Sequence, residues 1–189
     1  MAAGIDDYRR KCWDAALHAY GTSYIFQKRA ASLKRKTDML TWVGLAVPIL
    51  TGALVGTFGG YKLWGAAIIA GSVVAALQLV FSLWSVIRRW PEELSYSSAS
   101  ATANESLASR FAALGEDPPT ALQALRIQFQ KLDVEDAARR DRDNEKNVTE
   151  KERRMGMRAA LRKFQRQCAT CRQTPATMEP SDCGVCGKF

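Results

Sequence analysis

Four cysteines near the C-terminus have the spacing of a metal site. They occur as Cys168-Ala-Thr-Cys171 and Cys183-Gly-Val-Cys186, with eleven residues between the two pairs. Each CxxC pair can form a tight turn that offers two thiolates, and two such turns can enclose one tetrahedral Zn²⁺ with bonds of about 2.3 Å. Four thiolates leave no coordination position open, so the sequence predicts a structural zinc and a tail at 168–189 that is disordered without metal. Iron in a rubredoxin-like site and a redox-active CxxC pair are the alternatives.

The residues around these cysteines favour a compact turn structure. Gly184 and Gly187 are expected to permit the backbone turns that direct amide N–H groups at the sulfurs. The fifth cysteine, Cys12, is far from the others in the sequence, and we expect it to fill a small apolar space. In a reducing compartment, five cysteines favour metal or redox chemistry over structural disulfides.

Two long apolar segments, 39–58 and 61–87, determine how the rest of the chain is arranged. Lys62 is the only charged residue between Asp38 and Arg88. A helix of about 20 residues is roughly 30 Å long, which matches the hydrocarbon core of a bilayer. The sequence therefore predicts a two-helix transmembrane hairpin, and the alternative is a buried core hairpin of a soluble protein.

Basic residues flank the predicted hairpin at both of its outer ends. Lys34, Arg35 and Lys36 precede the first segment, and Arg88 and Arg89 follow the second. Lys and Arg next to membrane helices are retained on the cytoplasmic side. We therefore expect a multi-pass protein with both termini in the cytoplasm.

Small residues in the hairpin favour close contacts between helices. Gly52 and Gly56 form a GxxxG pair, and Gly71 lies in a small-residue repeat of the second segment. Such faces let helix backbones approach in lipid, either within one hairpin or between subunits. Gln78 is the costliest side chain to leave unpaired in hydrocarbon, so we expect it to form an interhelical hydrogen bond or to line a water path. Two helices cannot enclose a pore, and conduction would therefore require a homo-oligomer.

The remaining segments are predicted to be cytoplasmic helices. Residues 1–38 carry an apolar stripe at spacings of three and four, which is expected to pack on the helices after the hairpin rather than on the membrane surface. Residues 88–167 are predicted to contain a coiled-coil-like seam that contacts the first helix or a partner subunit. The seam residues are Leu122, Leu125, Phe129 and Leu132. From 133 to 154 apolar residues nearly vanish, which predicts a solvated helix with pairs such as Glu135 with Arg139.

The charge of the chain indicates anionic partners. The formal net charge is +8 over 189 residues, so the lipid bilayer is the default partner and nucleic acid the alternative. The last predicted helix carries Arg158, Arg162, Lys163 and Arg166, which are expected to form a charged outer face or to contact phosphates. A single histidine, a closed metal site and the lack of a glycine-rich phosphate loop predict that the protein is not an enzyme.

Together these features predict an all-α membrane protein. Its expected parts are a cytoplasmic amphipathic helix at 1–38, a transmembrane hairpin at 39–87, cytoplasmic helices at 88–167, and a small four-cysteine zinc-ribbon-like tail at 168–189.

The cysteine spacing resembles that of the bacterial mobilome CxxCx(11)CxxC proteins, and the wider layout resembles the SLATT superfamily of two-transmembrane proteins. The resemblance implies a bacterial inner-membrane effector, encoded in mobile or antiphage defence islands, that opens a pore or disrupts the membrane. It also implies a sensor partner encoded nearby, such as a nucleotide-generating enzyme or a reverse transcriptase. The alternative function is a membrane-anchored adaptor whose zinc tail recruits a protein or a nucleic acid.

Overall fold

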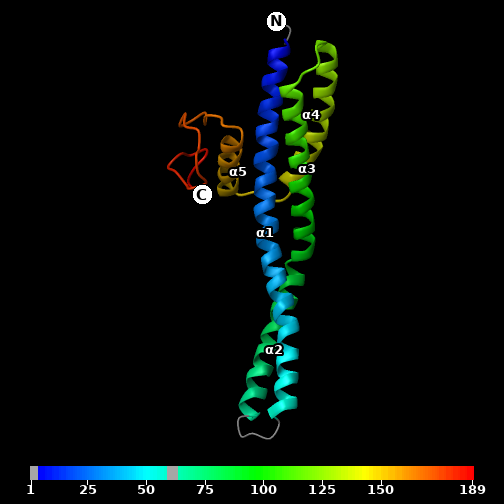
Figure 1. The fold of residues 1–189 in the computed structure, drawn as a ribbon, viewed down its shortest axis with the longest axis vertical. Helices are drawn as coiled ribbons and strands as arrows, with labels where there is room; N and C mark the ends of the chain where they lie inside the picture. Colours follow the sequence, from blue (N-terminus) through cyan, green and yellow to red (C-terminus); the bar gives the residue numbers. More distant parts are fainter. Residues whose placement is uncertain (1–3, 59–63) are drawn as a thin grey trace. The chain divides into compact units, whose positions relative to one another are not determined.

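The computed structural model describes residues 4–58 and 64–189, without the side chains of residues 48, 51–58, 64 and 66–68. Its helices are α1 (Ile5–Phe58), α2 (Trp64–Ile87), α3 (Trp90–Glu116), α4 (Leu122–Asn144) and α5 (Glu150–Lys163) (Figure 1). The described residues contain no strand, which confirms the predicted all-α class. The chain forms two compact units, one made of Met1–Lys28 with Ser97–Phe189 and the other of Arg29–Tyr96.

Local signals in the sequence explain where several helices begin. Thr149 caps α5 through a capping box, in which its hydroxyl accepts from the Glu152 N–H and the Glu152 carboxylate accepts from the Thr149 N–H. The α3 helix has Pro91 in its first turn, where a missing N–H costs nothing, and Glu92 and Glu93 complement its dipole. No such break separates the predicted segments 1–38 and 39–58, which form the single helix α1.

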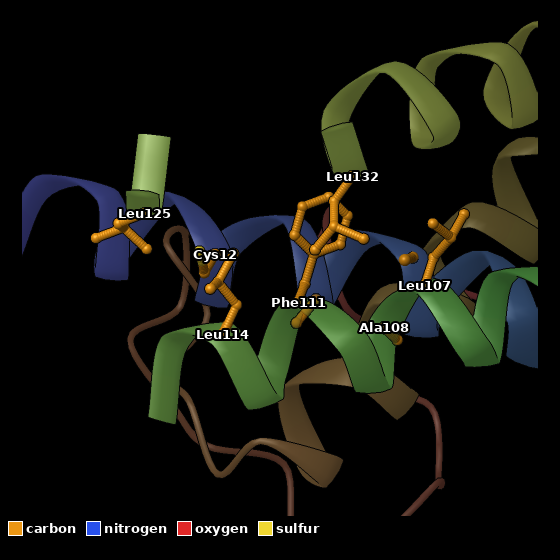
Figure 2. Packing of buried hydrophobic residues seen from close by; sticks show 9 residues of the cluster. Cys12, Leu107, Ala108, Phe111, Leu114, Leu125 and Leu132 are labelled. Carbon is orange, nitrogen blue, oxygen red and sulfur yellow. The ribbon is translucent and has the colours of Figure 1, made fainter. Parts of the chain in front are cut away.

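A hydrophobic core joins α1, α3 and α4 in the first unit. Figure 2 shows Leu132 of α4 beside Phe111 of α3, and Leu114 of α3 beside Cys12 of α1. The buried members are Cys12, Ala16, Ala19, Leu107, Ala108, Phe111, Leu114, Leu125 and Leu132. The apolar stripe of the first helix therefore packs against Leu125, Phe129 and Leu132 of the predicted seam within one chain, whereas the fourth seam residue, Leu122, is exposed. Cys12 fills an apolar space, and burial raises the pKa of its thiol to about 11.

A second buried layer between α3 and α4 is polar. The Asp143 carboxylate accepts hydrogen bonds from Ser100 (2.8 Å) and Asn104 (2.7 Å) and pairs with Arg139 at 2.7 Å. All four side chains are buried. The prediction of a solvated helix over 133–154 is therefore wrong for this face of α4, because the guanidinium and the two donors from α3 replace water around the carboxylate.

The ion pairs of α4 also differ from the prediction. Glu135 bonds to Arg110 of α3 and not to Arg139 on its own helix. The hydrogen bond from Arg110 lowers the pKa of the Glu135 carboxyl. These contacts connect neighbouring helices, which the spacing of charges along one helix does not reveal.

Figure 1 shows α5 beside α1. Two glycines, Gly21 of α1 and Gly156 of α5, lie in contact where these helices cross. A Cβ atom at Gly156 would lie 2.6 Å from the carbonyl oxygen of Gly21 and 2.8 Å from Cγ1 of Ile25. A Cβ atom at Gly21 would lie 3.2 Å from the Gly156 oxygen. The backbones therefore touch at this crossing, which accounts for a glycine inside α1 that otherwise weakens the helix by about 1 kcal/mol relative to alanine.

In the second unit, α2 packs beside the part of α1 that follows residue 28. A Cβ atom at Gly44 of α1 would lie 2.7 Å from Nε2 of Gln78 in α2. An apolar groove of about 320 Å³ lies between the helices and is lined by Val43, Val74, Leu77 and the aliphatic part of Gln78, among others.

Within the described part of the chain, one stretch, Ile69–Ile87 of α2, is long and apolar enough to cross a membrane. None of its most apolar window is buried, in contrast to the core helix of a soluble protein. The first predicted segment, 39–58, includes residues whose side chains lie outside the described set, and the two-span hairpin therefore stays a prediction.

We expect Gly156→Ala to destabilise the first unit, although alanine is the better helix former. The added methyl overlaps the Gly21 carbonyl and Ile25, and such overpacking costs about 1–3 kcal/mol. The melting temperature of the full chain in non-ionic detergent should fall by several degrees, since about 1 kcal/mol shifts it by roughly 2–4 °C at this size. Lys151→Ala, on an exposed position of the same helix, is the control and should leave the melting temperature nearly unchanged. Equal behaviour of the two variants would contradict the close crossing.

Candidate metal centre

The first cysteine pair is held in a tight turn directly after α5. The Arg172 N–H donates to the Cys168 carbonyl oxygen (2.8 Å), and the Cys168 N–H donates to the Gln173 oxygen (3.0 Å). Arg172 has φ of 55°, in the left-handed region that favours glycine. These bonds place the thiols of Cys168 and Cys171 on the same side of the turn.

The second cysteine pair repeats this arrangement near the C-terminus. The Gly187 N–H donates to the Cys183 carbonyl oxygen (3.0 Å), and the Lys188 N–H donates to the Ser181 oxygen (2.8 Å). The left-handed residue is Lys188, with φ of 55°, and no described glycine has a positive φ. Gly187 therefore does not permit this turn through a left-handed backbone conformation. This position needs glycine for space, because a Cβ atom would overlap the Ser181 carbonyl oxygen.

The two turns bring all four sulfur atoms together. The four Sγ atoms lie within 4.8 Å of one another, with 3.9 Å between Cys168 and Cys183 and 3.7 Å between Cys171 and Cys186. Bonds of about 2.3 Å to one tetrahedral ion require sulfurs roughly 3.8 Å apart, whereas a disulfide requires about 2.05 Å. The cysteines are unpaired and fit a single four-thiolate metal ion.

The electrostatics of the cluster also favour a bound cation. The N–H groups of Cys186 and Val185 point at Cys183 Sγ and lower the pKa of its thiol to about 6. Burial, together with the neighbouring sulfurs, raises the pKa of Cys186 to about 12. Four adjacent thiolates repel one another, so full deprotonation requires a positive ion among them. Metal binding then releases the proton of Cys186 at neutral pH.

Arg158 of α5 holds the tail through hydrogen bonds to three of its residues. Its side chain is only 8% exposed, with Nε bonded to the Thr177 oxygen (2.8 Å) and Nη1 bonded to Ser181 Oγ and the Cys186 oxygen (both 3.2 Å). The prediction that Arg158 lies on a charged outer face is therefore wrong. A basic residue in a basic helix gives no sequence signal that it will bind three groups of a following segment.

A second hydrophobic core connects the metal site to the helices. Its buried residues are Leu17, Ala160, Leu161, Cys168 and Cys186. Phe164, which directly follows α5, packs edge-on against Trp13 and Tyr20 of α1. The sulfurs of the more buried cysteines therefore face the rest of the first unit, while Cys171 and Cys183 are partly exposed.

The other predicted site residues belong to the second unit. Gly52 and Gly56 lie outside the residues whose side chains are described, and Gly71 is a partly exposed residue of α2. Gln78 lies against Gly44, a close approach that the sequence analysis missed because Gly44 has no glycine four residues away. The packing role of the first three glycines remains a prediction.

Removing one thiol should abolish stable metal binding. We expect the full chain, purified in non-ionic detergent, to contain about one metal ion by elemental analysis, since the four sulfurs share one centre. Cys183→Ser should lose this ion to a chelator under conditions in which the parent protein keeps it, yet remain in the membrane fraction. Cys12→Ala removes the distant thiol and should keep the metal. Retention of one ion by Cys183→Ser would contradict four-sulfur coordination.

Adding a methyl group next to the second turn should loosen the metal without removing a ligand. Gly187→Ala overlaps Ser181, whereas a Cβ atom at Gly184 meets nothing within 4 Å. An overpacking cost of about 1–3 kcal/mol corresponds to a factor of roughly 5 to 150, so we expect metal transfer to a chromogenic chelator to be faster by at least about fivefold. Gly184→Ala is the matched control and should transfer metal at the parental rate. Similar rates for the two variants would show that the Ser181 contact does not restrain the turn.

No curated protein and no solved structure matches the chain. In the comparison with protein families, residues 9–189 match the family described as "Mobilome CxxCx(11)CxxC protein". The match contains both cysteine pairs and covers nearly the whole sequence, which confirms the predicted resemblance to this family, while the resemblance to the SLATT superfamily stays a prediction. The chain belongs to the mobilome CxxCx(11)CxxC protein family.

Proposed function

We propose that this protein is embedded in a membrane through α2 and the adjoining part of α1. The observation that carries the proposal is the apolar stretch Ile69–Ile87, whose most apolar window is not buried at all. Large apolar side chains are also exposed on α1, where Trp42 is 75% and Ile49 68% exposed. Contiguous apolar surface of this extent is unfavourable in water at about 25 cal/mol per Å², but a lipid bilayer would cover it.

In this proposal, the segments 39–58 and 61–87 form a two-span hairpin in the bacterial inner membrane, with both termini in the cytoplasm. Basic residues at one end of the hairpin support this orientation. The Lys36 ammonium lies 5.5 Å from the ring centroid of Trp90, and the Arg88 guanidinium lies 5.1 Å from that of Trp84. Aromatic rings paired with cations are suited to the headgroup region of a bilayer.

The metal centre is proposed to hold structural Zn²⁺. Zinc prefers four thiolates in tetrahedral geometry, and sulfur separations of 3.7 and 3.9 Å match its bond length. A closed set of four ligands leaves no position for a substrate, so we assign the ion a structural and not an enzymatic role. Its proposed task is to hold the tail against α5 and α1.

As its biological role, we propose an oligomeric effector that forms a pore or disrupts the inner membrane, as SLATT-like proteins are thought to do. The family description refers to the mobilome, which is compatible with a task in mobile-element or antiphage defence. Because two helices cannot enclose a pore, activity would require several copies of the chain. A sensor protein encoded nearby, either a nucleotide-generating enzyme or a reverse transcriptase, would supply the trigger.

A membrane-anchored adaptor is the second candidate function. Val185, between the cysteines of the second pair, is 39% exposed, although it is a large apolar residue. The turn that carries it is fixed by Arg158 and by the metal ligands on either side. An exposed apolar side chain in a rigid turn is suited to recruiting a partner protein. Because the helices are basic, nucleic acid is a further candidate partner.

The two functions predict different effects of the chain on membrane potential. We expect induced expression of the full chain, with its sensor gene present, to depolarise bacteria within minutes, as measured with a voltage-sensitive dye. Gly44→Leu should reduce depolarisation at equal membrane abundance, because the larger side chain displaces Gln78 from the α1–α2 contact. Val185→Ser is the matched control for the tail and should leave depolarisation unchanged in an effector. The adaptor is favoured instead if the membrane stays polarised with the sensor present. In that case the parent chain should co-purify with a partner protein, and Val185→Ser should lose this partner.

A further inference from the structure

A polar pocket of about 390 Å³ lies in the first unit, apart from the metal ligands and from the apolar segments. Three parts of the chain form its walls, namely α1, the end of α5 and the cysteine tail. The lining residues used below are Tyr20, Tyr24, Arg162, Lys163, Gln165 and Met178. A pocket of this volume is at the lower end of the range of small-molecule sites.

Two adjacent cations at the pocket have no acidic partner among the residues that the structure describes. The other arginines of this region are engaged: Arg158 binds the tail, and Arg166 pairs with Asp14 at 2.6 Å. Arg162 and Lys163 form no ion pair with any described residue, and the Lys163 ammonium lies 6.0 Å from the Tyr20 ring centroid. Two unpaired neighbouring cations in a concave site are suited to an anion with several oxygens.

The α1 wall supplies two aromatic rings with hydroxyl groups. Tyr20 and Tyr24 are one helical turn apart, both are partly buried, and both line the pocket. Burial, followed by the nearby Glu105, raises the pKa of Tyr20, so its hydroxyl stays a neutral donor. Glu105 is the acidic group on this side and accepts a hydrogen bond from Gln27 (2.8 Å). Tyrosine rings at a basic site favour a ligand that has a flat, partly apolar group beside its charge.

We propose that this pocket binds a soluble phosphate ester that carries a planar ring, with nucleoside monophosphates as the model class. Arg162 and Lys163 contact the phosphate, and Tyr20 and Tyr24 flank the ring. The site does not depend on the proposed membrane activity, because every lining residue belongs to the first unit.

The tail connects this pocket to the metal centre. Met178 lines the pocket, and the carbonyl oxygen of the preceding residue, Thr177, accepts a hydrogen bond from Nε of Arg158. The same guanidinium holds the Cys186 carbonyl oxygen. Loss of the metal therefore releases one wall of the pocket and should weaken the ligand. By linkage, the ligand should tighten metal binding by the same free energy.

The test is calorimetric titration of the full, metal-loaded chain in non-ionic detergent with AMP, adenosine, ribose 5-phosphate and inorganic phosphate. We expect AMP to bind more tightly than each of the other three compounds, since only AMP presents both groups. The double variant Arg162→Gln with Lys163→Gln should weaken AMP at least tenfold. Lys151→Gln removes an exposed charge from the same helix outside the pocket and should not change the affinity.

Several results would overturn the proposal. These are no binding of AMP, equal affinity for AMP and inorganic phosphate, or equal weakening by the double variant and by Lys151→Gln. A lipid headgroup is tested by adding short-chain phosphatidylglycerol to the same titration. Tighter binding of this lipid than of AMP, with loss of the AMP signal when the lipid is present, would assign the pocket to lipid and also reject the proposal. Metal content and melting temperature of each variant confirm that it is folded, so that a negative result refers to the pocket.

Discussion

The contact on which the first unit depends is the meeting of two backbones at Gly21 and Gly156. Only hydrogen atoms occupy the Cβ positions there, so α5 can lie close enough to α1 for Leu161 to join Leu17 in one core. That core also contains Cys168 and Cys186, and half of the metal ligands are therefore positioned by a helix crossing far from them in sequence. Local turns set the geometry within each cysteine pair, whereas the contact between α1 and α5 determines where the pairs lie relative to the helices.

Periodicity predicted much of this fold because it reports which face of a helix is buried. The stripe that includes Cys12 and the seam that includes Leu125 and Leu132 both follow helical spacing, and both are buried. The cysteine cluster was equally predictable, since two CxxC pairs at this distance have few other arrangements. The cysteine spacing also indicated the family, but it gave no information about which residues hold the tail against the helices.

The burial of polar residues between α3 and α4 could not be predicted from the sequence. Asp143 and Arg139 are buried because α3 presents Ser100 and Asn104 at the same level, and no pattern within α4 contains that information. The Oδ1 atom of Asn104 is buried with no hydrogen-bond partner in the described part of the chain, so this layer holds a polar atom that an apolar core would avoid. The contacts of Gly44 and Arg158 were not predicted for the same reason, since each depends on a second element.

Arg158 has one more consequence. Four thiolates around a divalent ion carry a net charge of about −2, and a buried guanidinium bonded to the carbonyl of one ligand residue offsets part of it. Part of the charge compensation for the metal centre thus comes from α5, outside the segment 168–189 that contains the cysteines. The tail is for this reason not a portable metal-binding module. Grafted onto another protein, it would keep its ligands and lose its counter-ion.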